Sequence, residues 1–172
     1  MVFYIIGYMG SGKSTIGRKL ARKLNCDFFD TDRMVEERFN LNEFDIFQKY
    51  GADLYRQTEV EVIQQLQGLT NAVISCGGGL PCHSNNIDFI NLHGKSIYIK
   101  MSPKSLAIRL FNARKKRALI QDHLQSVDKV EEFIVSQLVT QELIFNQAHI
   151  EIKGENINVD KIVQLIGDEL GK

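Results

Sequence analysis

The chain has 172 residues, 44% of them hydrophobic, and its 21 basic and 21 acidic side chains leave no formal net charge at neutral pH. This length suits a single domain with its own core, and the balanced charge argues against a general nucleic-acid or membrane-surface binder. The three cysteines, Cys26, Cys76 and Cys82, have neither a paired nor a metal-binding spacing. Together with the lack of a long apolar span, this predicts a soluble, cytoplasmic protein with reduced thiols.

A phosphate-binding loop follows the first predicted strand. Residues 2–6 form an apolar, β-rich run, and residues 7–15 read Gly-Tyr-Met-Gly-Ser-Gly-Lys-Ser-Thr, which matches G-x-x-x-x-G-K-[ST]. Apolar residues at helical spacing follow, so the motif has the strand, loop and helix that it requires. Glycines let backbone amides curl around phosphate oxygens, and the start of a helix favours the same anion. The loop therefore predicts a nucleoside triphosphate site. Its expected phosphate-binding residues are Gly10, Ser11, Gly12, Lys13, Ser14 and Thr15.

Two residues of this loop have specific expected roles. Lys13 would reach the β and γ phosphates, and the Ser14 hydroxyl would ligate Mg²⁺.

Two aspartates follow the second predicted strand, residues 27–30, where the sequence reads Asp30, Thr31 and Asp32. Carboxylates at this position can hold Mg²⁺ through water and orient an attacking hydroxyl as a general base. The alternative is that Asp30 or Asp32 only caps the next helix.

The rest of the chain alternates between helical and strand patterns. Helices are predicted over 34–39, over 43–51 with Gly51 as the end, over 52–69, from a Ser84 cap to Leu92, and from Pro103 onward. The longest is predicted over 127–148, and a last one around Leu165; strands are predicted over 72–76, 96–101 and 150–152. This order predicts a three-layer α/β/α fold with a five-stranded parallel sheet, whose ligands lie beyond the carboxyl ends of the strands.

Three further features are candidates for the same site. The run Gly77, Gly78 and Gly79 suggests a close approach of backbone to a ligand, although a plain turn is the alternative. Arg56 lies on a helix among polar neighbours and would, by itself, be taken for a surface arginine. A basic run suits a mobile lid that closes over phosphates, and a solvated helix face explains it equally well. This run consists of Arg109, Arg114, Lys115, Lys116 and Arg117.

Taken together, these motifs resemble the shikimate kinase family, a group of P-loop kinases similar to the nucleoside monophosphate kinases. The resemblance extends over nearly the whole chain and includes Tyr55, Arg56 and Glu59 as well as the loop, the glycine run and a lid over about 112–124. It implies one monomeric kinase domain over 1–172 that transfers the γ-phosphoryl group of ATP to the 3-hydroxyl of shikimate. It also implies that Lys13, Asp32 and Arg117 are catalytic.

The resemblance further implies particular ligand contacts. Asp30 would hold the water shell of Mg²⁺, and Arg109 would lie near the adenine. Asp32, Arg56 and Gly77 to Gly79 would contact shikimate, with the planar Arg56 guanidinium on its carboxylate.

Two positions depart from the pattern of the family. Gln141 stands where a second arginine normally binds the substrate carboxylate, and no arginine follows Arg117 in the chain. Ala118 replaces the proline that usually follows the lid arginine, which predicts a less restrained Arg117. These departures leave two alternatives open: a related P-loop kinase of another small hydroxylated metabolite, and a nucleotide-binding regulatory protein without catalysis.

Overall fold

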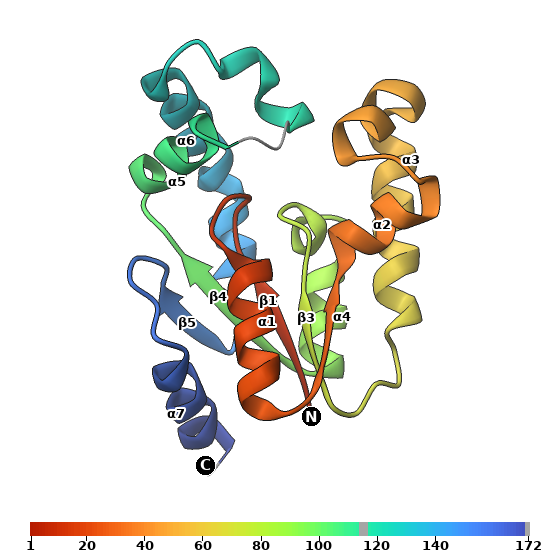
Figure 1. Cartoon of the computed structure of the whole chain (residues 1–172), viewed down its shortest axis with the longest axis vertical. Coiled ribbons are helices and arrows are strands. Elements are labelled where there is room, and N and C mark those ends of the chain that lie inside the picture. Colours follow the sequence, from red (N-terminus) through yellow and green to blue (C-terminus); the bar gives the residue numbers. More distant parts are fainter. Residues whose placement is uncertain (114–116, 171–172) are drawn as a thin grey trace.

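The computed structural model describes residues 1–113 and 117–170, which fold around one five-stranded sheet. Its strands are β1 (Val2–Ile6), β2 (Asp27–Asp30), β3 (Ala72–Ser75), β4 (Lys95–Lys100) and β5 (Ile150–Lys153). They lie in the order β2-β3-β1-β4-β5, and every neighbouring pair is parallel. The predicted parallel sheet is therefore confirmed, and β1, which leads into the phosphate loop, is its central strand (Figure 1).

Helices cover both faces of the sheet and make the predicted three layers. They are α1 (Lys13–Leu24), α2 (Thr31–Phe39), α3 (Glu43–Gln65), α4 (Asn86–His93), α5 (Pro103–Phe111), α6 (Val127–Phe145) and α7 (Val159–Leu170), with the short 3-10 helices η1 (Leu80–Cys82) and η2 (Ala118–His123). The whole of β1 is buried, as expected of a central parallel strand. Its side chains alternate: Phe3 and Ile5 pack with α1 and α7, whereas Tyr4 and Ile6 pack with α3 to α6.

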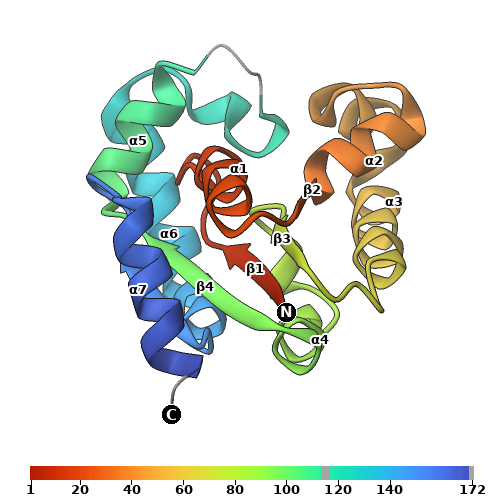
Figure 2. The same ribbon diagram turned by 60° about the horizontal axis from the view of Figure 1, so that its bottom comes forward.

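Two groups of helices extend beyond the carboxyl ends of the strands. At one edge α2 and α3 follow β2 and share a small core of their own, formed by Val35, Ile46, Tyr55 and Val62. At the other edge α5, η2 and α6 follow β4. Figures 1 and 2 both show these groups on opposite sides of the phosphate loop and the start of α1. η2 contacts both α6 and α3, so it lies between the two groups.

The predicted helix break at Gly51 is confirmed, because this residue has the non-helical φ 83° and ψ 169° and divides α3 into two helical parts. Each part is shorter than α6, whose 19 residues agree with the prediction that it is the longest helix. One predicted cap was wrong: Ser84 does not cap α4, because the helix begins at Asn86 and the cap position belongs to Asn85. Among the described helices, none is long and apolar enough to cross a membrane.

Candidate active site

The loop between β1 and α1 has the backbone conformation of an anion-binding cradle. Gly7, Gly10 and Gly12 have φ values of 140°, 81° and 93°, which any side chain would strain. A Cβ atom on Gly7 would also lie only 2.7 Å from the carbonyl oxygen of Ile99. Gly12 is the N-cap of α1, so the helix begins at Lys13 and directs its positive end at the loop.

Lys13 is buried beneath this loop. Its Nζ donates hydrogen bonds to the carbonyl oxygens of Gly7 at 2.8 Å and Tyr8 at 2.9 Å. Burial lowers the pKa of the Lys13 ammonium to about 8, although the nearby carboxylates of Asp32 and Asp30 oppose this shift. Carbonyl oxygens are weak partners for a desolvated cation, and a phosphate would be a stronger one.

A small pocket of about 180 Å³ opens above the cradle and contains most of the predicted phosphate-binding residues. Its lining consists of Met9, Gly10, Gly12, Lys13, Ser14, Thr15, Asp32, Gly78 and Arg117. Ser11 is fully buried in the loop behind it. Arg109 lies over the same loop from α5, and its Nη1 donates to the carbonyl oxygens of Ser11 at 3.4 Å and Gly10 at 3.5 Å. We name this space the phosphate pocket.

Oxygen donors of the kind that Mg²⁺ prefers are present at this end of the sheet. The Ser14 hydroxyl lines the phosphate pocket and lies 3.4 Å from the Ser75 hydroxyl at the end of β3. Asp30 ends β2, and its carboxylate accepts a hydrogen bond of 3.4 Å from the Arg33 amide as the N-cap of α2. The capping role that the sequence left open for Asp30 is thus observed. The donor set of hydroxyl and carboxylates fits Mg²⁺.

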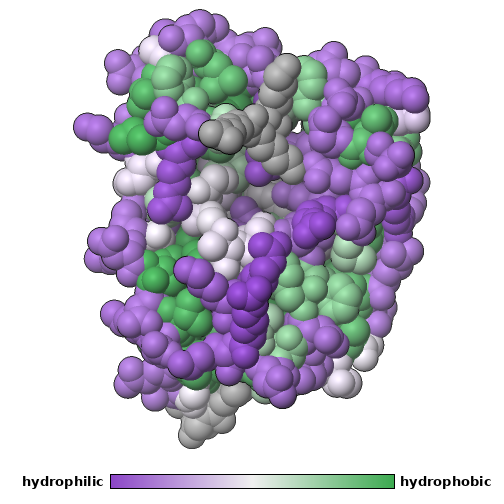
Figure 3. Space-filling view, viewed as in Figure 1, coloured by the Kyte–Doolittle hydropathy of each residue, from purple (hydrophilic) through white to green (hydrophobic). Residues whose placement is uncertain are grey.

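A second pocket, of about 320 Å³, lies beside the first, and we name it the acceptor pocket. It is lined by Tyr8, Met9, Arg56, Gly78, Gly79, Cys82, His83, Leu119, Gln137, Thr140 and Gln141. Met9 and Gly78 line both pockets, so the two spaces form one cleft. Figure 3 shows a hollow with a largely hydrophilic rim on this face of the molecule. Within the described residues, the Tyr8 hydroxyl and Gln141 Oε1 are buried here without a hydrogen-bond partner, as expected of groups that await a polar ligand.

The glycine run after β3 separates the two pockets, and its lack of side chains has a steric cause. A Cβ atom on Gly77 would lie 2.4 Å from Asp32 Oδ1, and one on Gly78 would lie 2.9 Å from the Met9 backbone nitrogen. On Gly79 it would lie 2.8 Å from Arg56 Nη1. The sequence predicted close approach to a ligand. The observed close approach is to the protein's own site residues, which these glycines allow to gather.

Arg56 is not a surface residue, because it forms a partly buried ion pair with Glu59 one turn later on α3. Arg56 Nη1 lies 2.5 Å from Glu59 Oε2, and the Glu59 side chain is only 2% exposed. Burial raises the pKa of Glu59 to about 7, although the charge and hydrogen bond of Arg56 lower it. Arg56 itself lines the acceptor pocket, where its guanidinium presents N–H donors.

Asp32 and Arg117 meet where the two pockets join. Asp32 Oδ1 accepts a hydrogen bond of 3.4 Å from the Tyr55 hydroxyl, and Arg117 Nη1 lies 3.8 Å from Asp32 Oδ2. A shorter contact, 2.7 Å, joins Arg117 Nη1 to Glu43 Oε2 on α3. Although burial would lower the pKa of Arg117, the carboxylates of Glu43 and Asp32 outweigh it and raise that pKa. The guanidinium is thus held inside the cleft.

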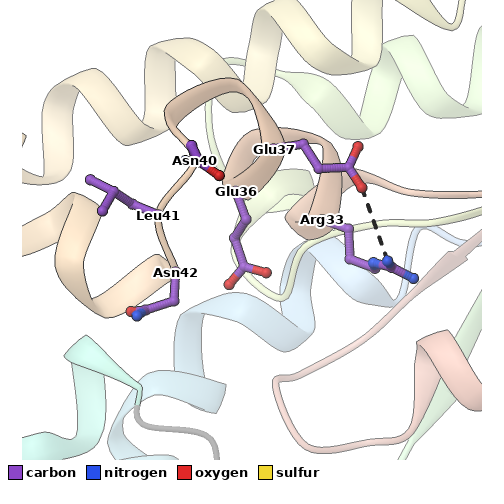
Figure 4. A pocket seen from close by; sticks show the side chains of 6 residues that line it. All are labelled: Arg33, Glu36, Glu37, Asn40, Leu41 and Asn42. Carbon is purple, nitrogen blue, oxygen red and sulfur yellow. Dashed lines mark ion pairs between the residues drawn. The ribbon is translucent and has the colours of Figure 1, made fainter.

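Another hollow, of about 350 Å³, lies outside this cleft on the surface of α2 and the start of α3 (Figure 4). Its lining consists of Arg33, Glu36, Glu37, Asn40, Leu41 and Asn42. Arg33 and Glu37 are exposed and form an ion pair of 4.0 Å along one helical turn. Such a pairing is ordinary for a solvated helix face, so we place the functional site in the cleft.

The structure brings most of the predicted loop residues, Asp32, Arg56, Gly78, Gly79, Arg117 and Gln141 to this one cleft, and Arg109 lies over the loop. Asp30 and Gly77 line neither pocket: the Asp30 carboxylate caps α2, and the Gly77 amide donates to the Thr31 hydroxyl. Three lysine and arginine residues of the predicted lid, 114–116, lie outside the described residues. Sequence reasoning did not identify Glu43 or Tyr8 as site residues. Glu43 resembles any acidic residue in the first turn of a helix, where the helix dipole favours it. Tyr8 occupies a variable position of the loop motif, which carries no signal.

The chain is similar to several proteins named shikimate kinase. The family model described as shikimate kinase matches residues 9–170. A shikimate kinase of Azobacteroides pseudotrichonymphae is 38% identical over 162 residues, which is 94% of each chain. The crystal structure of a shikimate kinase from Bacteroides thetaiotaomicron superposes with a TM-score of 0.87 at 31% identity, covering 100% of this chain and 99% of the other. A shikimate kinase from Acinetobacter baumannii, solved in complex with shikimate, gives a TM-score of 0.87 at 28% identity over 97% and 93% of the two chains.

Proposed function

The chain belongs to the shikimate kinase family, and from this we propose that it folds as one kinase domain that transfers the γ-phosphoryl group of ATP to the 3-hydroxyl of shikimate. The observation that carries the proposal is the single cleft, in which a phosphate pocket and an acceptor pocket share Met9 and Gly78. Asp32 and Arg117 stand at the junction. A phosphoryl group passing from one pocket to the other would cross this point.

The donor would bind at the phosphate pocket. Backbone amides of the loop and the N-terminus of α1 favour the phosphate oxygens, and Lys13 would exchange its carbonyl partners for the β and γ phosphates. Ser14 and Asp30 would hold Mg²⁺ and its water shell, and the ion, when bound, neutralises charge on the phosphates. Arg109, which already lies over the loop, would contact the nucleotide from above.

The acceptor would bind at the other pocket. Arg56 supplies a planar guanidinium for the shikimate carboxylate, and the partnerless Tyr8 hydroxyl and Gln141 amide oxygen offer further polar contacts. Asp32 would orient the attacking hydroxyl and accept its proton, while Arg117 would stabilise charge on the transferred group. η2 packs against α3, and its Leu119 lines the acceptor pocket, so η2 lies at the edge of the cleft. We infer that η2 excludes water, which would otherwise compete for the phosphoryl group.

A coupled assay of ADP release tests the proposed function. We expect MgATP turnover that depends on shikimate and yields shikimate 3-phosphate, detected by mass spectrometry. Parallel reactions with non-carboxylate polyols and sugar acids test the alternative of another hydroxylated acceptor, which requires faster ADP release with one of these compounds. Tight MgATP binding by a folded protein without turnover on any acceptor would instead identify a nucleotide-binding protein that lacks catalysis.

Gln141 is the place where the acceptor pocket can be improved. A Gln141→Arg variant is expected to lower the KM for shikimate by roughly tenfold, because it replaces a neutral contact by a charge-assisted one. The KM for ATP is expected to change much less. The matched control is Gln137→Arg, which adds the same charge one helical turn earlier in the same pocket. Equal effects of the two variants would mean that a general positive potential, not a contact at position 141, binds the acceptor.

A further inference from the structure

Glu43 has an acidic side chain that is buried in the cleft, and it has no role in the reaction proposed for this site. It is the first residue of α3, and its side chain is 8% exposed. Its backbone amide donates to Glu36 Oε1 at 2.9 Å, and Asn42 caps the helix start by accepting from the Asp45 amide. These bonds fix the backbone from which the Glu43 carboxylate reaches Arg117 Nη1 at 2.7 Å.

The ordinary explanation of an acidic residue in a first helical turn is the helix dipole, and it does not account for this position. Asp45, in the same turn, is exposed and accepts a hydrogen bond from the nearby Asn42 side-chain amide. Glu43 instead points into the junction of the two pockets, together with Asp32, Tyr55, Arg56 and Arg117. Burying a carboxylate costs free energy, so its specific partner is the informative feature.

We propose that Glu43 is a positioning residue that holds the Arg117 guanidinium at the junction of the two pockets, ready for the transferred phosphoryl group. This inference rests on the proposed function. Ala118, in place of the usual proline, predicts a poorly restrained Arg117, and the ion pair with Glu43 supplies the missing restraint from α3.

The geometry explains how the pair can assist the reaction without blocking it. An arginine has five N–H donors, and the contact with Glu43 involves Nη1, so the other nitrogens remain able to meet a phosphoryl oxygen. Among the described residues, the other carboxylate within 4.0 Å of Arg117 is Asp32, at 3.8 Å. Without Glu43, the guanidinium would therefore pair with Asp32, the group that has to accept the proton of the attacking hydroxyl.

Steady-state kinetics of Glu43→Gln test the proposal. We expect kcat to fall roughly tenfold, because the charge-assisted contact is lost, and the KM for ATP to stay within about threefold. Glu43→Asp, which keeps the charge and shortens the side chain, should recover part of the lost kcat. The matched control is Glu61→Gln on the same helix, which breaks a surface ion pair with Arg38 of 2.8 Å and should leave kcat unchanged.

A double-mutant cycle separates positioning from a structural role. In an Arg117→Ala background, Glu43→Gln should have little further effect on kcat, because the residue acts through that arginine. The proposal is overturned if the two changes multiply, if Glu43→Gln keeps the kcat of the parent, or if Glu61→Gln lowers kcat as much. A parent enzyme without shikimate-dependent turnover would reject the proposed function instead. The role of Glu43, which rests on that function, would fall with it, whereas in a parent that turns over shikimate the outcomes above concern Glu43 alone.

Discussion

An Asp32→Asn variant is expected to lose about 10²- to 10⁴-fold in kcat, the usual contribution of a positioned general base. The amide keeps the size of the side chain and can still accept from the Tyr55 hydroxyl, now at 3.4 Å from the carboxylate. It can no longer take the proton of the attacking hydroxyl. Removing the negative charge near Lys13 also removes an electrostatic contribution that raises the pKa of that ammonium. Because the proposed ATP site is the loop, the KM for ATP should change far less than kcat.

Two measurements test whether the loss of kcat is specific to the Asp32 carboxylate. Asp53→Asn, an exposed position on α3, is the matched control, and it should retain the kcat and melting temperature of the parent. Thermal unfolding of Asp32→Asn should show a folded protein, so that the lost activity is not lost structure. A variant that keeps more than about a tenth of kcat would mean that Asp32 orients the acceptor without accepting its proton, since a hydrogen-bonding amide can still orient.

The sheet and the phosphate pocket could be predicted because the sequence patterns that indicate them are local. The loop motif, the apolar run before it and the helical spacing after it occupy consecutive residues, and parallel strands must bring their carboxyl ends to one edge. β1 pairs with β3 so that Ile5 lies beside Ser75. This register places the glycine run, which follows β3, next to the phosphate loop, which follows β1. Asp32 follows the outer strand β2 at the same edge.

The remaining features depend on contacts between residues far apart in the chain. Arg56 resembles a surface residue until its helix is placed against the glycine run, where Glu59 pairs with it. Glu43 is separated from Arg117 by 74 residues, and no local pattern joins them. Ser84 has the right residue type for a cap, but α4 begins one residue too late, so that Asn85 occupies the cap position. Composition and spacing do not encode these outcomes, because the tertiary fold decides them.

Lys13→Met is expected to change activity and stability in opposite directions. Loss of the cation that we propose for the β and γ phosphates should lower kcat/KM for ATP by at least about 10³-fold, a loss of roughly 4 kcal/mol of transition-state stabilisation. The same change removes a buried charge from the protein without ligand. One pKa unit corresponds to about 1.4 kcal/mol, and burial lowers the Lys13 pKa from 10.5 to about 8. The lost hydrogen bonds to Gly7 and Tyr8 offset part of that gain. We therefore expect a net stabilisation of about 1 kcal/mol at pH 7.

The pH dependence of this stabilisation identifies its source. In the parent, the folded state holds the Lys13 proton less tightly than the unfolded state, so the unfolded state binds more protons between pH 8 and pH 10.5. The parent therefore gains stability from this group as the pH rises through that window, whereas Lys13→Met does not.

Urea unfolding of both proteins at pH 7, 8 and 9.5 measures this effect. The free energy of unfolding of the variant should exceed that of the parent most at pH 7, and the difference should shrink as the pH rises. Lys19→Met, which removes an exposed lysine of the same helix, should show no such window. An advantage that stays constant with pH would mean that packing of the methionine, and not relief of a desolvated charge, stabilises the variant. The free-energy cost of forming the phosphate-binding site would then come from other residues of the loop.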